Sequence, residues 1–157
     1  MKVEERSPNA ARRLRNRSVV AWLRLARVYQ QVDHASARHM RRWGLSVAQF
    51  DALVKIGLSE GMTQQQLADS LLVTKGNVCQ LLGRMEQLDL LVREQDGRAN
   101  RLRLSPKGRQ LLDEILPAQE ALVSHQFDAL DFEEQRELVR LLGKLDRSAS
   151  SERRASA

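Results

Sequence analysis

Apolar residues recur every three or four positions over two adjacent stretches, which predicts two short amphipathic helices. Thr63 can cap the first helix, and Gln66 stands three residues later, where it completes a capping box. Thr74 can cap the second helix, and Leu72 and Val73 before it leave room only for a tight turn. The pattern therefore predicts a helix-turn-helix. Its apolar stripes are Leu67, Ala68 and Leu71 in the first helix and Val78, Leu81, Leu82, Met85 and Leu88 in the second.

Two short runs of alternating polarity follow over residues 91–105. Asp96-Gly97 lies between them and is a typical hairpin turn signal. In the second run Leu102 and Leu104 point to one side of the strand, and the arginines between them point to the other. A basic β-hairpin directly after a helix-turn-helix predicts a wing.

Long helices are expected on both sides of this core. Residues 16–43 have one apolar side, which includes Trp22 and Tyr29, and Gly44 is a typical residue after a helix end. Ser46 and Gln49 form a second capping box and begin the next helix. The two aromatic side chains are expected to pack in the core or between subunits, or else to line a ligand crevice.

Ser105 followed by Pro106 is a strong helix start after the hairpin. Pro117 is expected to kink or split that helix, and Asp131 is expected to cap a last one. We therefore expect a mainly α fold with a small β-hairpin wing. The expected organisation is a basic flexible arm over 1–15, a domain over 16–147 with a winged helix-turn-helix core over 46–105 and flanking helices over 16–43 and 106–146, and a disordered tail over 148–157.

The charge of the chain is concentrated at its beginning. The 157 residues carry 26 basic and 20 acidic side chains, and 11 basic against 3 acidic ones fall in residues 1–44. A basic chain favours polyanionic partners, but this does not separate DNA from RNA or an anionic membrane. The arm over 1–15 is expected to be a solvated tail or a phosphate contact.

Several other kinds of chemistry lack a signal in the sequence. The single cysteine, Cys79, excludes an internal disulfide or a cysteine-based zinc site, and it is expected to be a packing residue or a bystander rather than a redox trigger. His34 and His39 are five residues apart, so they do not share a helix face as a metal-binding pair would. We expect no cofactor and no enzymatic activity. Neither an apolar leader nor a long uncharged apolar run is present, so we expect a cytoplasmic protein without membrane contact.

The second helix of the helix-turn-helix presents a polar side. At about 100° per residue, Gly76, Asn77, Gln80 and Arg84 fall opposite its apolar stripe. Asparagine and glutamine can pair with adenine edges in the major groove, and arginine can pair with guanine. This side is therefore a candidate for base recognition.

At this point the sequence resembles the MarR family of bacterial winged-helix regulators. The resemblance covers residues 16–147 in helix order and length, and its motifs lie within 63–108. The matching residues are Leu67-Ala68, Leu90-Leu91-Val92-Arg93, Asp96-x-Arg98 and Leu102-x-Leu104-Ser105-x-x-Gly108. The resemblance implies a short strand near Gly61-Met62 that pairs with the wing.

The candidate DNA contacts follow from position and chemistry. Helix N-termini favour phosphate, the polar side of the second helix faces the groove, and arginine enters narrow minor grooves. The motif match implies that Asp96 holds the wing turn or orients Arg98. Each of these residues could instead be an ordinary solvated surface residue. The candidates are Thr63, Gln64, Gln65, Thr74, Lys75, Asn77, Gln80, Arg84, Asp96, Arg98, Asn100 and Arg101.

The resemblance also implies a homodimer that pairs through its N- and C-terminal helices and binds an inverted repeat in double-stranded DNA. It implies a small, often aromatic and anionic effector in a crevice between the dimer helices and the DNA-binding lobe. In this chain that crevice would lie near Trp22, Tyr29, Phe50 and Asp51.

The sequence thus predicts a sequence-specific DNA-binding regulator, expected to be a repressor that a ligand releases. One alternative is a nonspecific architectural dimer that contacts only phosphates. Another is an interaction module that binds a second regulator through its terminal helices.

Overall fold

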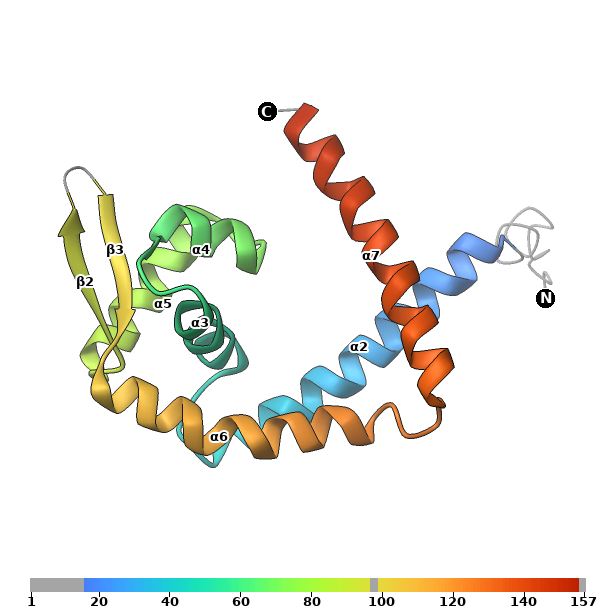
Figure 1. The fold of residues 1–157 in the computed structure, drawn as a ribbon, viewed down its shortest axis with the longest axis horizontal. Coiled ribbons are helices and arrows are strands. Elements are labelled where there is room, and N and C mark those ends of the chain that lie inside the picture. Colours follow the sequence, from blue (N-terminus) through green and yellow to red (C-terminus); the bar gives the residue numbers. More distant parts are fainter. Residues whose placement is uncertain (1–15, 97–98, 156–157) are drawn as a thin grey trace, which may run out of the picture. The chain divides into compact units, whose positions relative to one another are not determined.

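The computed structural model describes residues 16–96 and 99–155 of the 157-residue chain (Figure 1). It is mainly helical with one small antiparallel sheet, which confirms the predicted fold class. The chain divides into two compact units, of which one ends at Gln119 and the other begins at Glu120. The elements are α2 (Arg17–Arg41), α3 (Val47–Leu58), β1 (Met62–Thr63), α4 (Gln64–Leu71), α5 (Lys75–Gln87), β2 (Leu91–Asp96), β3 (Ala99–Leu104), α6 (Pro106–His125) and α7 (Phe132–Ala155).

The sheet consists of a hairpin of β2 and β3, and β1 pairs with the free edge of β3, which gives the strand order β1-β3-β2. Leu91 pairs with Leu104, and Met62 of β1 pairs with Leu102. The predicted hairpin and the short strand near Gly61-Met62 are both confirmed. The two residues at the hairpin tip, Gly97 and Arg98, lie outside the described residues.

The core of the first unit lies under this sheet. Leu102 and Leu104 point inward, as their alternation with arginines predicts, and both are buried. They belong to one cluster with side chains of α3, α4 and α5, and full burial of such a side chain stabilises the fold by about 2 kcal/mol. The fully buried members of that cluster include Leu53, Ile56, Leu67, Val78, Leu82 and Met85.

Helix starts agree with the sequence patterns. Ser46 and Gln49 form a reciprocal capping box at α3, and Thr63 and Gln66 form another at α4. Thr74 caps α5 by accepting a hydrogen bond from the backbone N–H of Asn77 at 3.3 Å. Each cap satisfies a backbone N–H that the helix itself leaves unpaired.

Pro117 was expected to kink or split its helix. The helix is not split, since α6 continues from Pro106 to His125. Buried contacts hold the helix on both sides of the proline: Ile115 is fully buried, and the Gln119 amide donates to the Ser36 hydroxyl at 2.7 Å. Tertiary contacts of this kind can outweigh the lost backbone hydrogen bond.

The tail expected to be disordered from residue 148 is helical instead, since α7 continues to Ala155. The sequence after Gly143 contains neither glycine nor proline up to that point, and most of its residue types are good helix formers. The Ser151 hydroxyl donates to the carbonyls of Arg147 and Ser148 one turn earlier, so this polar side chain is accommodated within the helix.

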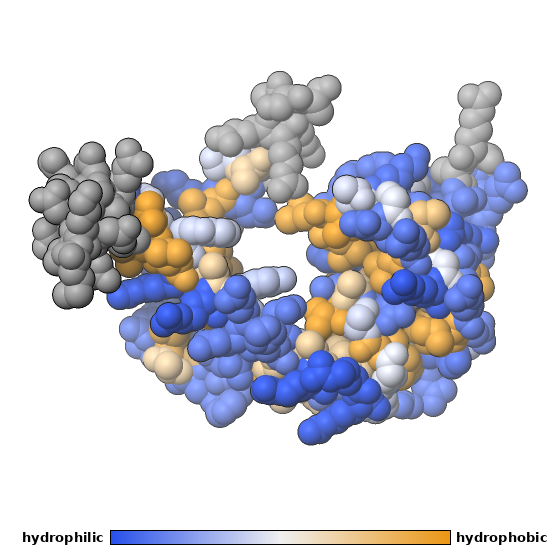
Figure 2. Space-filling model, turned by 180° about the vertical axis from the view of Figure 1, so that it is seen from behind, coloured by the Kyte–Doolittle hydropathy of each residue, from blue (hydrophilic) through white to orange (hydrophobic). Residues whose placement is uncertain are grey.

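Apolar side chains remain open on α2 and on α7, and orange patches interrupt the blue surface of the face drawn in Figure 2. A monomer rarely leaves a row of large apolar side chains in water, so each helix has a surface suited to a partner. The exposed side chains are Val19, Trp22, Leu23, Leu25, Val28 and Tyr29 on α2 and Phe132, Val139, Leu141, Leu142 and Leu145 on α7.

The junction between the wing and α6 explains the Leu-Ser-x-x-Gly motif. The Ser105 hydroxyl donates to the carbonyl of Asp89 at 2.6 Å and accepts from the backbone N–H of Gly108 at 2.9 Å. A Cβ atom at Gly108 would lie 1.9 Å from the carbonyl oxygen of Leu90. Position 108 therefore accepts only glycine without a shift of the backbone.

We predict that Gly108→Ala lowers the free energy of unfolding by about 1–3 kcal/mol, because the added methyl group collides with backbone. Gly76→Ala is the matched control, since a Cβ there meets nothing within 4 Å. Alanine at position 76 should leave stability unchanged or raise it by up to about 1 kcal/mol. Urea denaturation of both variants tests this, and equal stabilities would contradict the account of the junction.

Candidate nucleic-acid interface

Helix α5 has the two-sided character that the sequence predicts. Val78, Leu82 and Met85 are completely buried, whereas Asn77, Gln80 and Arg84 are exposed. Because a helix is rigid, burying one stripe fixes the opposite side toward solvent. Amide and guanidinium groups are thus presented on the surface of the second helix of a helix-turn-helix.

A tight turn places α5 against α4. Leu72 ends α4 in the left-handed region at φ +56°, and the backbone N–H of Val73 donates to the carbonyl of Ala68 at 3.1 Å. Thr74 and Lys75 then lie at the exposed start of α5. The Thr74 hydroxyl already accepts a hydrogen bond as the cap, so any phosphate contact would use its remaining donor.

The other residues that were predicted to contact phosphate at a helix N-terminus lie at the start of α4. Thr63 and Gln64 are half-buried and Gln65 is exposed. The Thr63 hydroxyl accepts from the backbone N–H of Gln66 at 3.2 Å, so this threonine also acts as a cap.

In the wing, Asp96 forms an ion pair with Arg101, the Arg101 Nε lying 3.0 Å from the Asp96 Oδ2. Arg101 also donates to the carbonyl of Gly61 at 3.1 Å, which ties the hairpin to the residue before β1. Asn100 is exposed. Asp96 was also expected to orient Arg98, but Arg98 lies outside the described residues.

Carboxylates also accompany Arg103 of the hairpin and Arg109 of α6. The Arg103 Nε lies 2.7 Å from Glu94, and Arg109 pairs with Glu60. Exposed ion pairs of this kind contribute only about 0–1 kcal/mol each. Their main effect is therefore on side-chain position, and such a pair can yield to a phosphate at small cost.

Arg93 belongs to one of the motifs that carry the family resemblance, but it was not among the candidate functional residues. It pairs with Leu102 on β3, so it lies on the same side of the hairpin as the buried leucines. Its guanidinium meets Glu86 of α5, with Nη2 2.8 Å from Oε2, and Gln64 of α4, with Nη1 3.3 Å from Oε1. A charged residue on the inner side of an alternating strand was the signal that could have revealed it.

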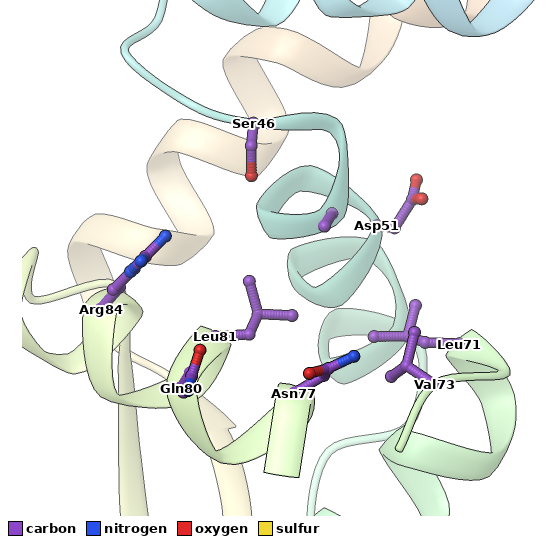
Figure 3. Close-up of a pocket in the computed structure, with 9 residues that line it drawn as sticks. Ser46, Asp51, Leu71, Val73, Asn77, Gln80, Leu81 and Arg84 are labelled. Carbon is purple, nitrogen blue, oxygen red and sulfur yellow. The ribbon is translucent and has the colours of Figure 1, made fainter. Parts of the chain in front are cut away.

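A hollow of about 360 Å³ lies between α5 and α3 (Figure 3). Figure 3 shows Asn77, Gln80 and Arg84 on α5 and Asp51 on α3. The lining of the hollow is Ser46, Ala48, Asp51, Leu71, Val73, Asn77, Gln80, Leu81 and Arg84. The hollow thus combines an apolar wall, one carboxylate and one guanidinium.

The surroundings of Asp51 oppose its charge. Although the side chain reaches solvent, partial burial raises the pKa of the Asp51 carboxyl above its usual value. The positive charge of Lys55 opposes this shift, and the negative charge of Asp33 adds to it. The carboxylate is therefore held in a less favourable environment than water.

The four residues expected to share a ligand crevice are not brought together in this hollow. Phe50 is only 6% exposed and belongs to the hydrophobic core, because the buried side of α3 includes it. Trp22 and Tyr29 are 64% and 67% exposed on α2 and do not line the hollow. Of the four, Asp51 alone contributes to its lining.

Comparisons with known proteins agree with this architecture. Residues 43–101 match the sequence model of the MarR family. An uncharacterized HTH-type transcriptional regulator of Bacillus cereus (strain ATCC 10987 / NRS 248) is 37% identical over 125 residues, which are 79% of this chain and 85% of that protein. The chain belongs to the MarR family. It is thus a DNA-binding transcriptional regulator, as the sequence predicts.

Solved structures resemble this MarR-family regulator over most of its length. AbsC, a MarR family regulator from Streptomyces coelicolor, is 25% identical and has a TM-score of 0.78, with 84% of this chain and 93% of AbsC covered. BpsR of Bordetella bronchiseptica, whose DNA binding is regulated by 6-hydroxynicotinic acid, is also 25% identical, with a TM-score of 0.73 and coverage of 81% and 98%. In the described part of the regulator, every helix is too short or too polar to cross a membrane.

We predict that Asp51→Asn stabilises this MarR-family regulator at neutral pH. A carboxyl whose pKa is raised by folding binds its proton more tightly in the folded state, so its stabilising effect is lost as pH rises. The variant should therefore match the wild type below the usual aspartate pKa of about 4, exceed it as pH rises through the raised pKa, and keep a constant advantage at higher pH. Thermal melts from pH 3 to 7 measure this difference.

Lys55→Met is the companion variant, because it removes the charge that opposes the shift. It should raise the pKa of Asp51 further, so that the loss of stability extends to higher pH and is larger in total. A difference in melting temperature between the Asp51→Asn variant and the wild type that stays constant across this range would contradict the prediction.

Proposed function

We propose that this regulator binds an inverted repeat in double-stranded DNA as a homodimer, represses transcription from that site, and is released by a small aromatic anion. The main support is the outward polar side of α5 next to an intact three-stranded wing. Repression follows where the DNA site overlaps a promoter.

The exposed apolar rows on α2 and α7 support the homodimer. Pairing of these helices between two copies would remove large side chains such as Trp22 and Leu145 from water. A two-fold dimer reads two half-sites on one face of the duplex, about 10 bp apart, so its site is an inverted repeat.

Within each half-site we assign different tasks to the two ends of α5. Asn77 and Gln80 carry amides that fit adenine edges, and Arg84 can reach guanine or backbone. Lys75, at the start of the helix, supplies a cation for phosphate. Arg98 at the wing tip is proposed to enter the minor groove, where narrow A·T tracts attract arginine.

Selection of bound sequences from random duplex DNA tests the proposed function. We predict a two-fold symmetric consensus for the wild type and the loss of preference at one position per half-site for Gln80→Ala, worth about 1–3 kcal/mol of discrimination. Gln110→Ala on α6 is the control and should return the wild-type consensus. Featureless enrichment by the wild type would favour an architectural protein that contacts only phosphates.

For the effector we propose an aromatic carboxylic acid, by analogy with the BpsR ligand. The hollow between α3 and α5 offers the Arg84 guanidinium for a carboxylate and Leu71, Val73 and Leu81 for a ring. A ligand there would occupy side chains that are needed for DNA, so it would bind the DNA-free protein better.

We predict that 6-hydroxynicotinate or a similar acid releases the labelled operator, as measured by fluorescence anisotropy. The Asp51→Asn variant should need about fivefold less ligand, because one repulsive charge near the anion costs about 1 kcal/mol in a water-like medium. Its affinity for DNA without ligand should stay close to that of the wild type. If the variant needs the same ligand concentration as the wild type to release the operator, the hollow is not the effector site.

A further inference from the structure

Three consecutive glutamines begin α4, and each has a different hydrogen-bond partner. The Gln66 side-chain oxygen accepts from the backbone N–H of Thr63 at 2.7 Å, as the second half of the capping box. The Gln65 amide nitrogen donates to the Asp69 carboxylate at 2.9 Å. The Gln64 side-chain oxygen accepts from Arg93 at 3.3 Å. Neighbours of identical type therefore offer different groups to a ligand.

The hydrogen-bond partner of Gln64 determines which end of its side-chain amide remains free to bind a ligand. A guanidinium can only donate hydrogen bonds, so the end of the amide that faces Arg93 is its oxygen. The amino group then points away as a pair of donors. Among the described residues, that amino group makes no hydrogen bond to the protein, and it is not one of the buried polar groups that lack a partner.

Arg93 is itself held from a second direction. Its other terminal nitrogen pairs with Glu86 at 2.8 Å, and its side chain is only 21% exposed. The buried Arg93 Nε has no hydrogen-bond partner among the described residues, so the guanidinium is held by a short ion pair to α5 and a longer hydrogen bond to α4. One side chain of β2 thus ties the wing to both helices of the helix-turn-helix.

We propose that the Gln64 amino group donates a hydrogen bond to a DNA backbone phosphate, and that Arg93 is the positioning residue that turns this group outward. A phosphate oxygen only accepts, so it fits the donor end that Arg93 leaves. The inference rests on the proposed function and refines it: Gln64 is the phosphate contact at this helix start, whereas the amino group of Gln65 is already engaged by Asp69.

Backbone contacts carry no sequence information. Loss of this contact therefore weakens binding to the operator and to an unrelated duplex by the same factor. Loss of a base-reading residue such as Gln80 acts differently, because it weakens operator binding more than binding to other DNA. The ratio of the two affinities separates the roles.

The test uses Gln64→Met and the control Gln110→Met, which are close in shape to the wild type and remove an amide without adding charge. Gln110 is exposed on α6 and is not a candidate DNA contact. Gln64→Met should weaken binding of the dimer to both duplexes at least about tenfold, because each copy loses a hydrogen bond to a charged group. Gln110→Met should stay within about twofold of the wild type on both. A Gln64→Met variant within twofold of the wild type, or an equal loss in Gln110→Met, overturns the proposal.

Arg93→Lys tests the positioning role, because lysine keeps the charge but lacks the fork that reaches two partners. Combined with Gln64→Met it should bind no more weakly than the weaker single variant, since both changes remove one contact. Additive losses with unchanged melting temperatures overturn the role of Arg93. If Arg93→Lys does not fold, the comparison of the two glutamine variants decides alone.

Failure of this inference is distinguishable from failure of the proposed function. A wild-type protein that prefers no DNA sequence rejects the proposed function. A wild-type protein that selects an operator, together with an unaffected Gln64→Met variant, rejects only the phosphate contact.

Discussion

The burial of one apolar stripe on α5 is the constraint on which the rest of the interface depends. Val78, Leu82 and Met85 are fully enclosed by side chains of α3, α4 and the sheet, so the helix has one allowed rotation about its axis. Three such side chains supply about 6 kcal/mol of burial, comparable to the whole stability of a small domain. A polar group on the opposite side, such as Gln80, is therefore held outward by packing several residues away.

The wing depends on weaker forces of a different kind. Its two long strands are held by backbone pairing and by the inward leucines. The described arginines on it, Arg93, Arg101 and Arg103, are accompanied by the carboxylates of Glu86, Asp96 and Glu94. Individual exposed pairs add little stability, but together they set the direction of each cation. The interface thus combines a rigid helix with a hairpin whose charges can be exchanged with phosphate.

Much of the fold was predictable because its signals are local. Caps at Ser46, Thr63 and Thr74 depend on residues three positions away, and the hairpin register follows from alternation. The outward side of α5 follows from helical geometry for the same reason. The bridge made by Arg93 was not predictable in this way, since Gln64 is 29 residues distant from it.

Long-range packing also decides where local patterns are ambiguous. Phe50 has the spacing of a core residue and of a crevice residue alike, and its burial in the core follows from the position of the neighbouring elements. Pro117 remains in a helix because contacts on either side of it outweigh its local preference. The sequence describes such preferences, whereas tertiary contacts decide among them.

Protection of guanine N7 from methylation measures most directly whether α5 occupies the major groove. On a selected operator we expect protected guanines in two clusters about one helical turn apart, each matched to one copy of the helix. Hydroxyl-radical footprinting should show backbone protection around the same positions. Backbone protection without any change at guanine N7 in a site that contains guanines in both halves would contradict the account.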